Sequence, residues 1–182
     1  MKKENIVVYI LRLALTLLAI TAVVAAALAA VNSVTAPAIA ELNAQKTQEA
    51  IELVLPGGGE EIADYPAVDL VAKVYKGENG YAIQTTPGGF DNTITMMVGV
   101  DTEGNVLGIS IIKHTETAGL GAVAAAGTPA GENFRGQFVG ASGSVSVTKD
   151  GGTMDAITGA TITSRAVCAG VNAALECAAQ MG

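Results

Sequence analysis

An uninterrupted apolar segment near the amino terminus constrains this chain more than any other feature of its sequence. From Leu13 to Val31, nineteen residues carry no charge, and only Thr16 and Thr21 are polar. About 20 apolar residues in a helix span the hydrocarbon core of a bilayer, because each helical residue adds about 1.5 Å. We therefore expect one transmembrane helix.

A cleaved signal peptide is the alternative interpretation of this segment, because Lys2, Lys3 and Arg12 precede it and small residues end it. Signal-peptide cores are shorter, at about 7–15 residues, which favours an uncleaved anchor. Residues 32–45 contain no Lys or Arg. The positive-inside rule then predicts a single-pass protein of the cytoplasmic (inner) cell membrane, with a cytoplasmic amino terminus and an extracytoplasmic head.

The remaining chain is long enough for one domain with its own core. We expect an amino terminus and anchor over residues 1–34, a stalk helix over residues 35–58 and a folded head over residues 59–182. The stalk helix is expected to start at Pro37 and to stop at the Pro-Gly-Gly-Gly sequence 56–59. A net charge of −7 argues against a nucleic-acid partner, which requires clustered Lys and Arg.

The head is predicted to belong to the α+β class, with an antiparallel sheet and a closing C-terminal helix. A helix is expected over residues 163–180, because Val167, Val171 and Leu175 recur at helical spacing after Thr163 or Ser164 as N-cap. Loops and a short helix are expected between His114 and Gly143. Strand character is found over residues 68–75, 81–86, 93–100 and 106–112, with a hairpin at 101–105 and one further short strand at 145–148.

Ordinary metal ligands are scarce in the sequence. His114 is the only histidine, and the two cysteines, Cys168 and Cys177, lie nine residues apart in the expected helix. At about 100° per residue they point to opposite faces, so we expect neither a disulfide nor a shared metal. Any redox chemistry of this chain then needs an organic cofactor.

Residues 155–164, with the sequence Asp-Ala-Ile-Thr-Gly-Ala-Thr-Ile-Thr-Ser, place small and hydroxylated side chains directly before a helix start. Helix N-termini attract phosphate through free N–H groups and the positive end of the helix dipole. Gly159 and Ala160 would let an anion approach the main chain, and Thr161 is well placed to carry a phosphate ester. The same residues are also what an ordinary capping turn prefers, so both interpretations remain open on spacing alone.

This stretch resembles the Asp-x-x-(Ser/Thr)-Gly-Ala-Thr motif of the FMN-binding domain family. That domain occurs in the G subunit of Rnf electron-transport complexes and in the C subunit of the sodium-pumping NADH:quinone oxidoreductase. The resemblance implies that Thr161 carries covalent FMN through a phosphoester, attached by a flavin transferase that uses FAD. The length of 182 residues fits the G subunit better, since the C subunit is a longer chain as a family.

A second motif, residues 114–121, resembles the His-x-Glu-Thr-Pro-Gly-Leu-Gly loop of the same family, with Ala118 in place of Pro. Its glycines would allow close approach to a flat ring, Leu120 would cover a ring face, and Glu116 and Thr117 would bond to polar edges. Lys149 would face the flavin phosphate or pyrimidine edge, with a solvated loop lysine as the alternative. The candidate cofactor-binding residues are Thr161, Asp155, Thr158, Gly159, Ala160, Glu116, Thr117, Gly119, Leu120, Gly121 and Lys149.

The resemblance extends over nearly the whole head, through Gly80-Tyr81, residues 97–101 and the pair Phe134 and Phe138. It implies an electron-carrying subunit of a membrane-bound complex that passes electrons from ferredoxin to NAD and exports Na⁺ or H⁺, with the other Rnf complex subunits as partners. No catalytic residue and no complete active site is expected on this chain alone. The alternatives are a C-type subunit of the quinone reductase and a stand-alone flavinylated extracytoplasmic reductase.

Overall fold

The computed structural model describes residues 6–182, so Lys2 and Lys3, on which the predicted orientation partly depends, lie outside the described residues. The chain divides into two compact units, Met1–Ala44 and Gln45–Gly182. The helix α1 (Ile6–Val54) begins in the first unit and ends in the second.

The apolar segment forms a helix whose side chains are exposed throughout, as expected for a membrane span. Among the described residues, α1 is the one helix long and apolar enough to cross a bilayer. Pro37 lies inside α1, so the expectation that it starts a new helix is wrong. A proline removes one backbone hydrogen bond from the interior of a helix and can bend the helix without ending it.

The second unit is built on a five-stranded antiparallel sheet in which the strands pair in chain order, β1-β2-β3-β4-β5. Four of the five strands expected from the sequence are present, and the predicted α+β fold class is confirmed. The strands are β1 (Glu60–Ile62), β2 (Val71–Gly77), β3 (Gly80–Thr85), β4 (Thr95–Asp101) and β5 (Val106–Lys113). The helical elements after the sheet are η1 (Gly121–Ala125), α2 (Pro129–Gly136), η2 (Thr148–Asp150) and α3 (Thr161–Met181).

The predicted hairpin between β4 and β5 is confirmed. The Asp101 carboxylate accepts hydrogen bonds from the backbone N–H groups of Glu103 and Asn105, both at 2.8 Å. The Asn105 side chain also donates to it, and this bond lowers the pKa of Asp101. Residues 145–148 do not form the expected strand, because only Val147 pairs there, in an isolated bridge with Met154.

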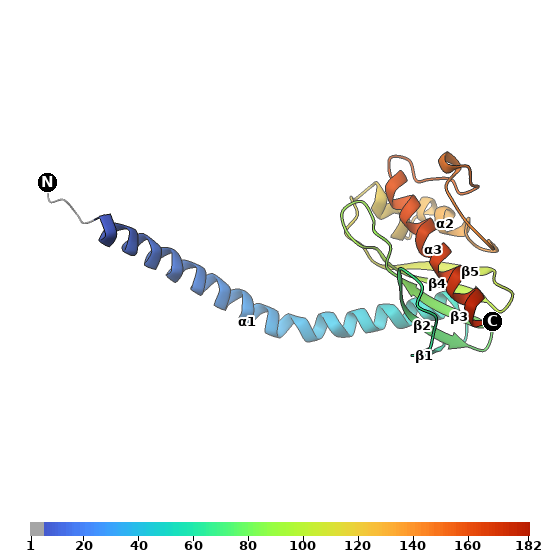
Figure 1. The fold of residues 1–182 in the computed structure, drawn as a ribbon, viewed down its shortest axis with the longest axis horizontal. Coiled ribbons are helices and arrows are strands. Elements are labelled where there is room, and N and C mark those ends of the chain that lie inside the picture. Colours follow the sequence, from blue (N-terminus) through green and yellow to red (C-terminus); the bar gives the residue numbers. More distant parts are fainter. Residues whose placement is uncertain (1–5) are drawn as a thin grey trace. The chain divides into compact units, whose positions relative to one another are not determined.

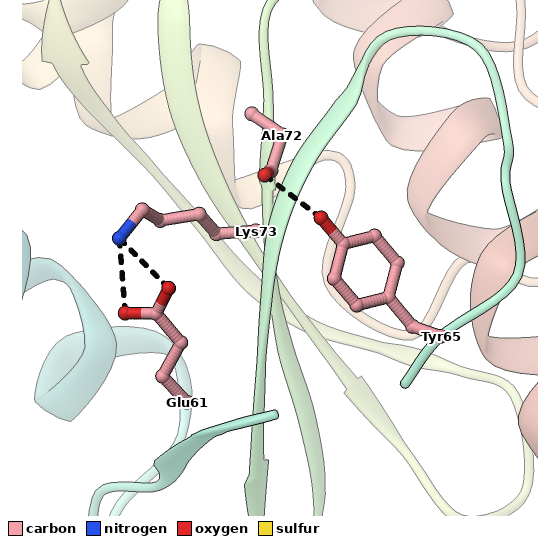
Figure 2. Close-up of polar contacts among 4 residues, drawn as sticks. All are labelled: Glu61, Tyr65, Ala72 and Lys73. Carbon is pink, nitrogen blue, oxygen red and sulfur yellow. Dashed lines mark hydrogen bonds and ion pairs between the residues drawn. The ribbon is translucent and has the colours of Figure 1, made fainter. Parts of the chain in front are cut away.

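The short edge strand β1 was not predicted from the sequence, because Glu60 and Glu61 give it no apolar pattern. The Lys73 ammonium in β2 donates hydrogen bonds to both carboxylate oxygens of Glu61, at 2.8 and 2.9 Å (Figure 2). The Tyr65 hydroxyl donates to the Ala72 carbonyl at 2.9 Å in the same region (Figure 2). Short, charged edge strands of this kind resist pairing with other chains.

Both faces of the sheet are covered, which explains why β4 is buried along nearly its whole length. On one face Val74, Ile83 and Val98 pack in the cluster that contains α3, which lies against β3 and β4 (Figure 1). On the other face lie the alternate residues of the strands, packed against the last turns of α1. That second cluster consists of Ala50, Ile51, Val54, Leu55, Tyr75, Ala82 and Met97.

We predict that Ile51→Ala destabilises the head by about 2–5 kcal/mol, because a fully buried side chain is lost and a cavity remains. Leu53 lies two residues along the same helix and is 70% exposed, so Leu53→Ala is the matched control and should change stability by about 0.5 kcal/mol or less. Thermal and urea unfolding of the full chain in detergent measure both effects. Equal effects of the two substitutions would show that the end of α1 is not part of the core.

Candidate functional site

Thr161 is the first residue of α3, two positions before the expected helix start. Ala160 occupies the N-cap position and has no side-chain cap, so the expectation that Thr163 or Ser164 caps the helix is wrong. Both hydroxyl side chains are buried inside the first turn. The first N–H groups of a helix have no partner within it, so the half-buried Thr161 lies at the donor-rich end of α3.

Ser164 fixes the turn that leads into the helix. Its hydroxyl donates to the Ala160 carbonyl and accepts from the Ile157 N–H, both at 3.0 Å. Gly159 has a φ of +77°, in the left-handed region that side chains disfavour, so the tight turn before Thr161 requires glycine. The local sequence therefore folds into a compact turn that presents the Thr161 hydroxyl.

Glu116 joins three segments of the chain beneath the site. Its carboxylate is 8% exposed and accepts a hydrogen bond from the Phe90 N–H at 2.8 Å and another from the Thr163 hydroxyl. A Cβ atom at Gly121 would collide with the Glu116 carboxylate and the Thr163 hydroxyl, so this position has room only for glycine. Glu116 thus bonds to the protein itself with both oxygens, an arrangement that its expected role at a flavin edge did not include.

Lys149 reaches the Thr161 hydroxyl from the short helix η2. The distance from Lys149 Nζ to Thr161 Oγ1 is 3.3 Å. The next residue, Asp150, forms two hydrogen bonds of 2.6 Å with the guanidinium of Arg165 in α3. These bonds hold the pKa of Asp150 below its usual value and raise that of Arg165, so the pair is charged at neutral pH.

These segments enclose a cavity of about 280 Å³. Of the candidate residues, Asp155, Thr158 and Gly119 do not line it. The backbone of Asp155 instead bonds to the Gln137 side chain, with its N–H donating at 2.7 Å. The lining residues are Phe90, Glu116, Thr117, Leu120, Gly121, Lys149, Gly159, Ala160, Thr161, Ile162 and Thr163.

Phe90 and Ile162 are lining residues that the motifs did not reveal. Phe90 is 66% exposed, which is unusual for a phenylalanine in a chain with only three and no tryptophan. The signal in the sequence was an aromatic residue directly after the Pro-Gly-Gly turn 87–89. The cavity thus has an ammonium and a hydroxyl at one end and apolar side chains on its walls.

The other candidate redox and metal ligands lie outside this cavity. Cys168 and Cys177 are free and buried, and burial raises the pKa of Cys168 to about 11, with the nearby charge of Asp150 adding to the shift. His114 is half-buried and does not line the cavity. Within residues 6–182, no group of three or more His, Cys, Asp or Glu side chains is arranged to hold a metal ion.

The cavity falls within a recognised domain. A family model described as the FMN-binding domain matches residues 89–176, a range that contains every residue lining the cavity. The fold and site therefore define a flavin-binding protein with a single apolar amino-terminal helix.

Curated relatives identify the family more closely. The chain is 33% identical to the G subunit of the ion-translocating oxidoreductase complex of Methanosarcina acetivorans, over 92% of this chain and 93% of the relative. It is 35% identical to the G subunit of the Na(+)-translocating ferredoxin:NAD(+) oxidoreductase complex of Acetobacterium woodii, over 92% and 90%. A proton-translocating counterpart from Clostridium ljungdahlii is 39% identical over 53% of this chain and 51% of its own length. The chain belongs to this G-subunit family, as the two motifs predicted.

We predict that Glu116→Ala destabilises the head by about 1–3 kcal/mol, because it leaves the buried Thr163 hydroxyl and the partly buried Phe90 N–H without their acceptor. Glu103→Ala is the matched control, since Glu103 is an exposed carboxylate in the hairpin between β4 and β5. Urea unfolding followed by circular dichroism compares the two variants. A loss as small as that of the control would contradict the role of Glu116 as the junction of the three segments.

Proposed function

We propose that this chain is the electron-carrying G subunit of a membrane-bound, ion-translocating complex that transfers electrons from ferredoxin to NAD. The FMN of this subunit is attached to Thr161 by a phosphoester. Two relatives that align with more than nine-tenths of the chain carry the proposal, because both are G subunits of ion-translocating complexes. This full-length similarity favours a G subunit over a quinone-reductase C subunit or a stand-alone reductase.

The residues of the cavity fit FMN. Lys149 and Thr161 supply a cation and a hydroxyl at the position where a phosphate would be esterified. The start of α3 adds backbone donors suited to an anion. Leu120, Phe90 and Ile162 supply apolar surface for a flat ring system, and Thr117 adds a polar group at the wall.

The remaining candidate residues act through the backbone in this proposal. Gly159, Ala160 and Gly121 let the cofactor approach the main chain, and Gly119, with a φ of +75°, turns the loop that carries Leu120. Asp155 and Thr158 belong to the stretch that precedes Thr161 and do not line the cavity.

FMN supplies reversible electron transfer in steps of one or two electrons. The protein's part is to hold the cofactor, shield one side of it and leave the other accessible to partner subunits of the complex. The chain itself would contact neither ferredoxin nor NAD. We place residues 1–34 in and before the membrane and the head on the extracytoplasmic side, where a covalent bond prevents loss of the cofactor.

We predict that Thr161→Ala abolishes covalent FMN, while Thr161→Ser, which keeps a hydroxyl, retains it. Each protein is co-expressed with the flavin transferase, denatured and examined by fluorescence and by mass, where one FMN less water should be added. Thr102→Ala is the matched control and should retain the flavin, because Thr102 is an exposed threonine of the hairpin between β4 and β5 and does not line the cavity. Covalent flavin on Thr161→Ala would identify another residue as the ester site.

The proposed orientation is tested by fusing alkaline phosphatase to the carboxyl terminus, because this enzyme acquires its disulfides only in an oxidising compartment. We expect an active fusion and, with green fluorescent protein instead, little fluorescence. Phosphatase fused directly after Arg12, before the apolar segment, is the control and should be inactive. An inactive carboxyl-terminal phosphatase together with a bright fluorescent fusion would reverse the orientation.

A further inference from the structure

We propose that the Asp150–Arg165 ion pair is a clasp that positions Lys149 beside the Thr161 hydroxyl, and that Lys149 assists the esterification of Thr161. This inference rests on the proposed attachment of FMN to Thr161. It assigns Lys149 a role in the attachment reaction itself, and it makes Asp150 and Arg165 positioning residues that act through Lys149.

The sequence spacing of Lys149 and Asp150, and of Thr161 and Arg165, places the ion pair next to the Lys149–Thr161 contact. Asp150 follows Lys149 directly in η2, and Arg165 lies four residues after Thr161, about one turn further along α3. The ion pair therefore joins the turn that carries the ammonium to the helix that carries the hydroxyl. The Asp150 carboxylate accepts hydrogen bonds from both Nε and Nη2 of the guanidinium, each at 2.6 Å. Such a two-bond pair fixes the relative orientation of the two side chains as well as the distance between them.

The backbone around Lys149 is itself folded into a tight turn, so the ion pair acts on a segment that is already ordered. The Asp150 N–H donates to the Val147 carbonyl at 2.8 Å, and the Thr148 N–H donates to the Met154 carbonyl at 2.9 Å. The chain that leaves this turn leads directly into residues 155–161. The long Lys149 side chain is exposed and would have many conformations without such constraints.

In the attachment reaction, the Thr161 Oγ forms a bond to the flavin-side phosphorus of FAD, supplied by a transferase. The bond from that phosphorus to the bridging oxygen breaks and AMP leaves, while the hydroxyl proton passes to a base of the transferase. No group is oxidised or reduced. The Lys149 ammonium stabilises negative charge developing on Oγ and on the phosphate oxygens, and stays paired with the anionic ester that results.

The head contains a second exposed ion pair that serves as a matched control. Lys73 and Glu61 have side chains that are 48% and 52% exposed, against 51% and 37% for Arg165 and Asp150. Their pair joins two strands at the sheet edge (Figure 2), and neither residue lines the cavity. Exposed pairs contribute little to stability, so neither pair is needed for folding.

The experiment measures the rate of covalent flavin incorporation into the full chain with transferase and FAD, together with the melting temperature. We expect Lys149→Met to slow incorporation by roughly 10–100-fold. Lys149→Arg, which keeps the charge, should recover most of the rate. Lys73→Met and Glu61→Gln should match the wild-type chain, and all melting temperatures should stay within about 3 °C of the wild-type value.

The clasp is tested by non-additivity. Asp150→Asn and Arg165→Met should each slow incorporation by roughly 3–10-fold while Lys149 is present. In combination with Lys149→Met, neither should slow it further, because a positioning residue has no effect once the group that it positions is gone. A purely structural role for the pair would instead add to the effect of Lys149→Met.

Each outcome decides a separate point. A wild-type chain that gains no covalent flavin would overturn the proposed function and this inference together. Normal flavin on Thr161 at an unchanged rate in Lys149→Met would overturn the inference alone. Slow incorporation in Lys149→Met with additive effects of Asp150→Asn would leave Lys149 in its role and exclude the clasp.

Discussion

The buried carboxylate of Glu116 is the interaction on which the site depends. It accepts hydrogen bonds from Phe90, 26 residues earlier, and from Thr163, 47 residues later. A buried carboxylate without partners is costly, so each of these bonds stabilises the arrangement of the segments that it joins. One group therefore connects the two loops and the first turn of α3, which together form most of the cavity wall.

The sheet provides the rigid support for that junction. Its two faces are covered by α3 and by the last turns of α1, so the strand residues alternate between two apolar clusters. Near the end of α1, the buried side chains of Ala50, Ile51 and Val54 belong to the core of the head. Because α3 packs along the sheet with its buried face, its first turn, with Thr161, is presented at a fixed place.

Local patterns in the sequence predicted what is local in the structure. The strands β2 to β5, the hairpin at Asp101 and the flavin motif before α3 all depend on neighbouring residues. Thr163 was wrongly expected to cap a helix, because its buried position follows from a partner 47 residues away. Phe90 and the Asp150–Arg165 pair were missed for the same reason. Their roles arise from contacts between segments that no spacing rule connects.

The size of the cavity gives a physical reason for a covalent bond in the proposed function. At about 280 Å³ it lies just below the roughly 300–1,000 Å³ that is usual for pockets which bury most of a ligand. A site that buries only part of FMN gains little affinity from apolar contact, since binding must first offset the loss of translational freedom. The proposed ester to Thr161 would make retention independent of that affinity. With Phe90 and Ile162 largely exposed, such a site would leave the proposed cofactor accessible to the subunits that exchange electrons with it.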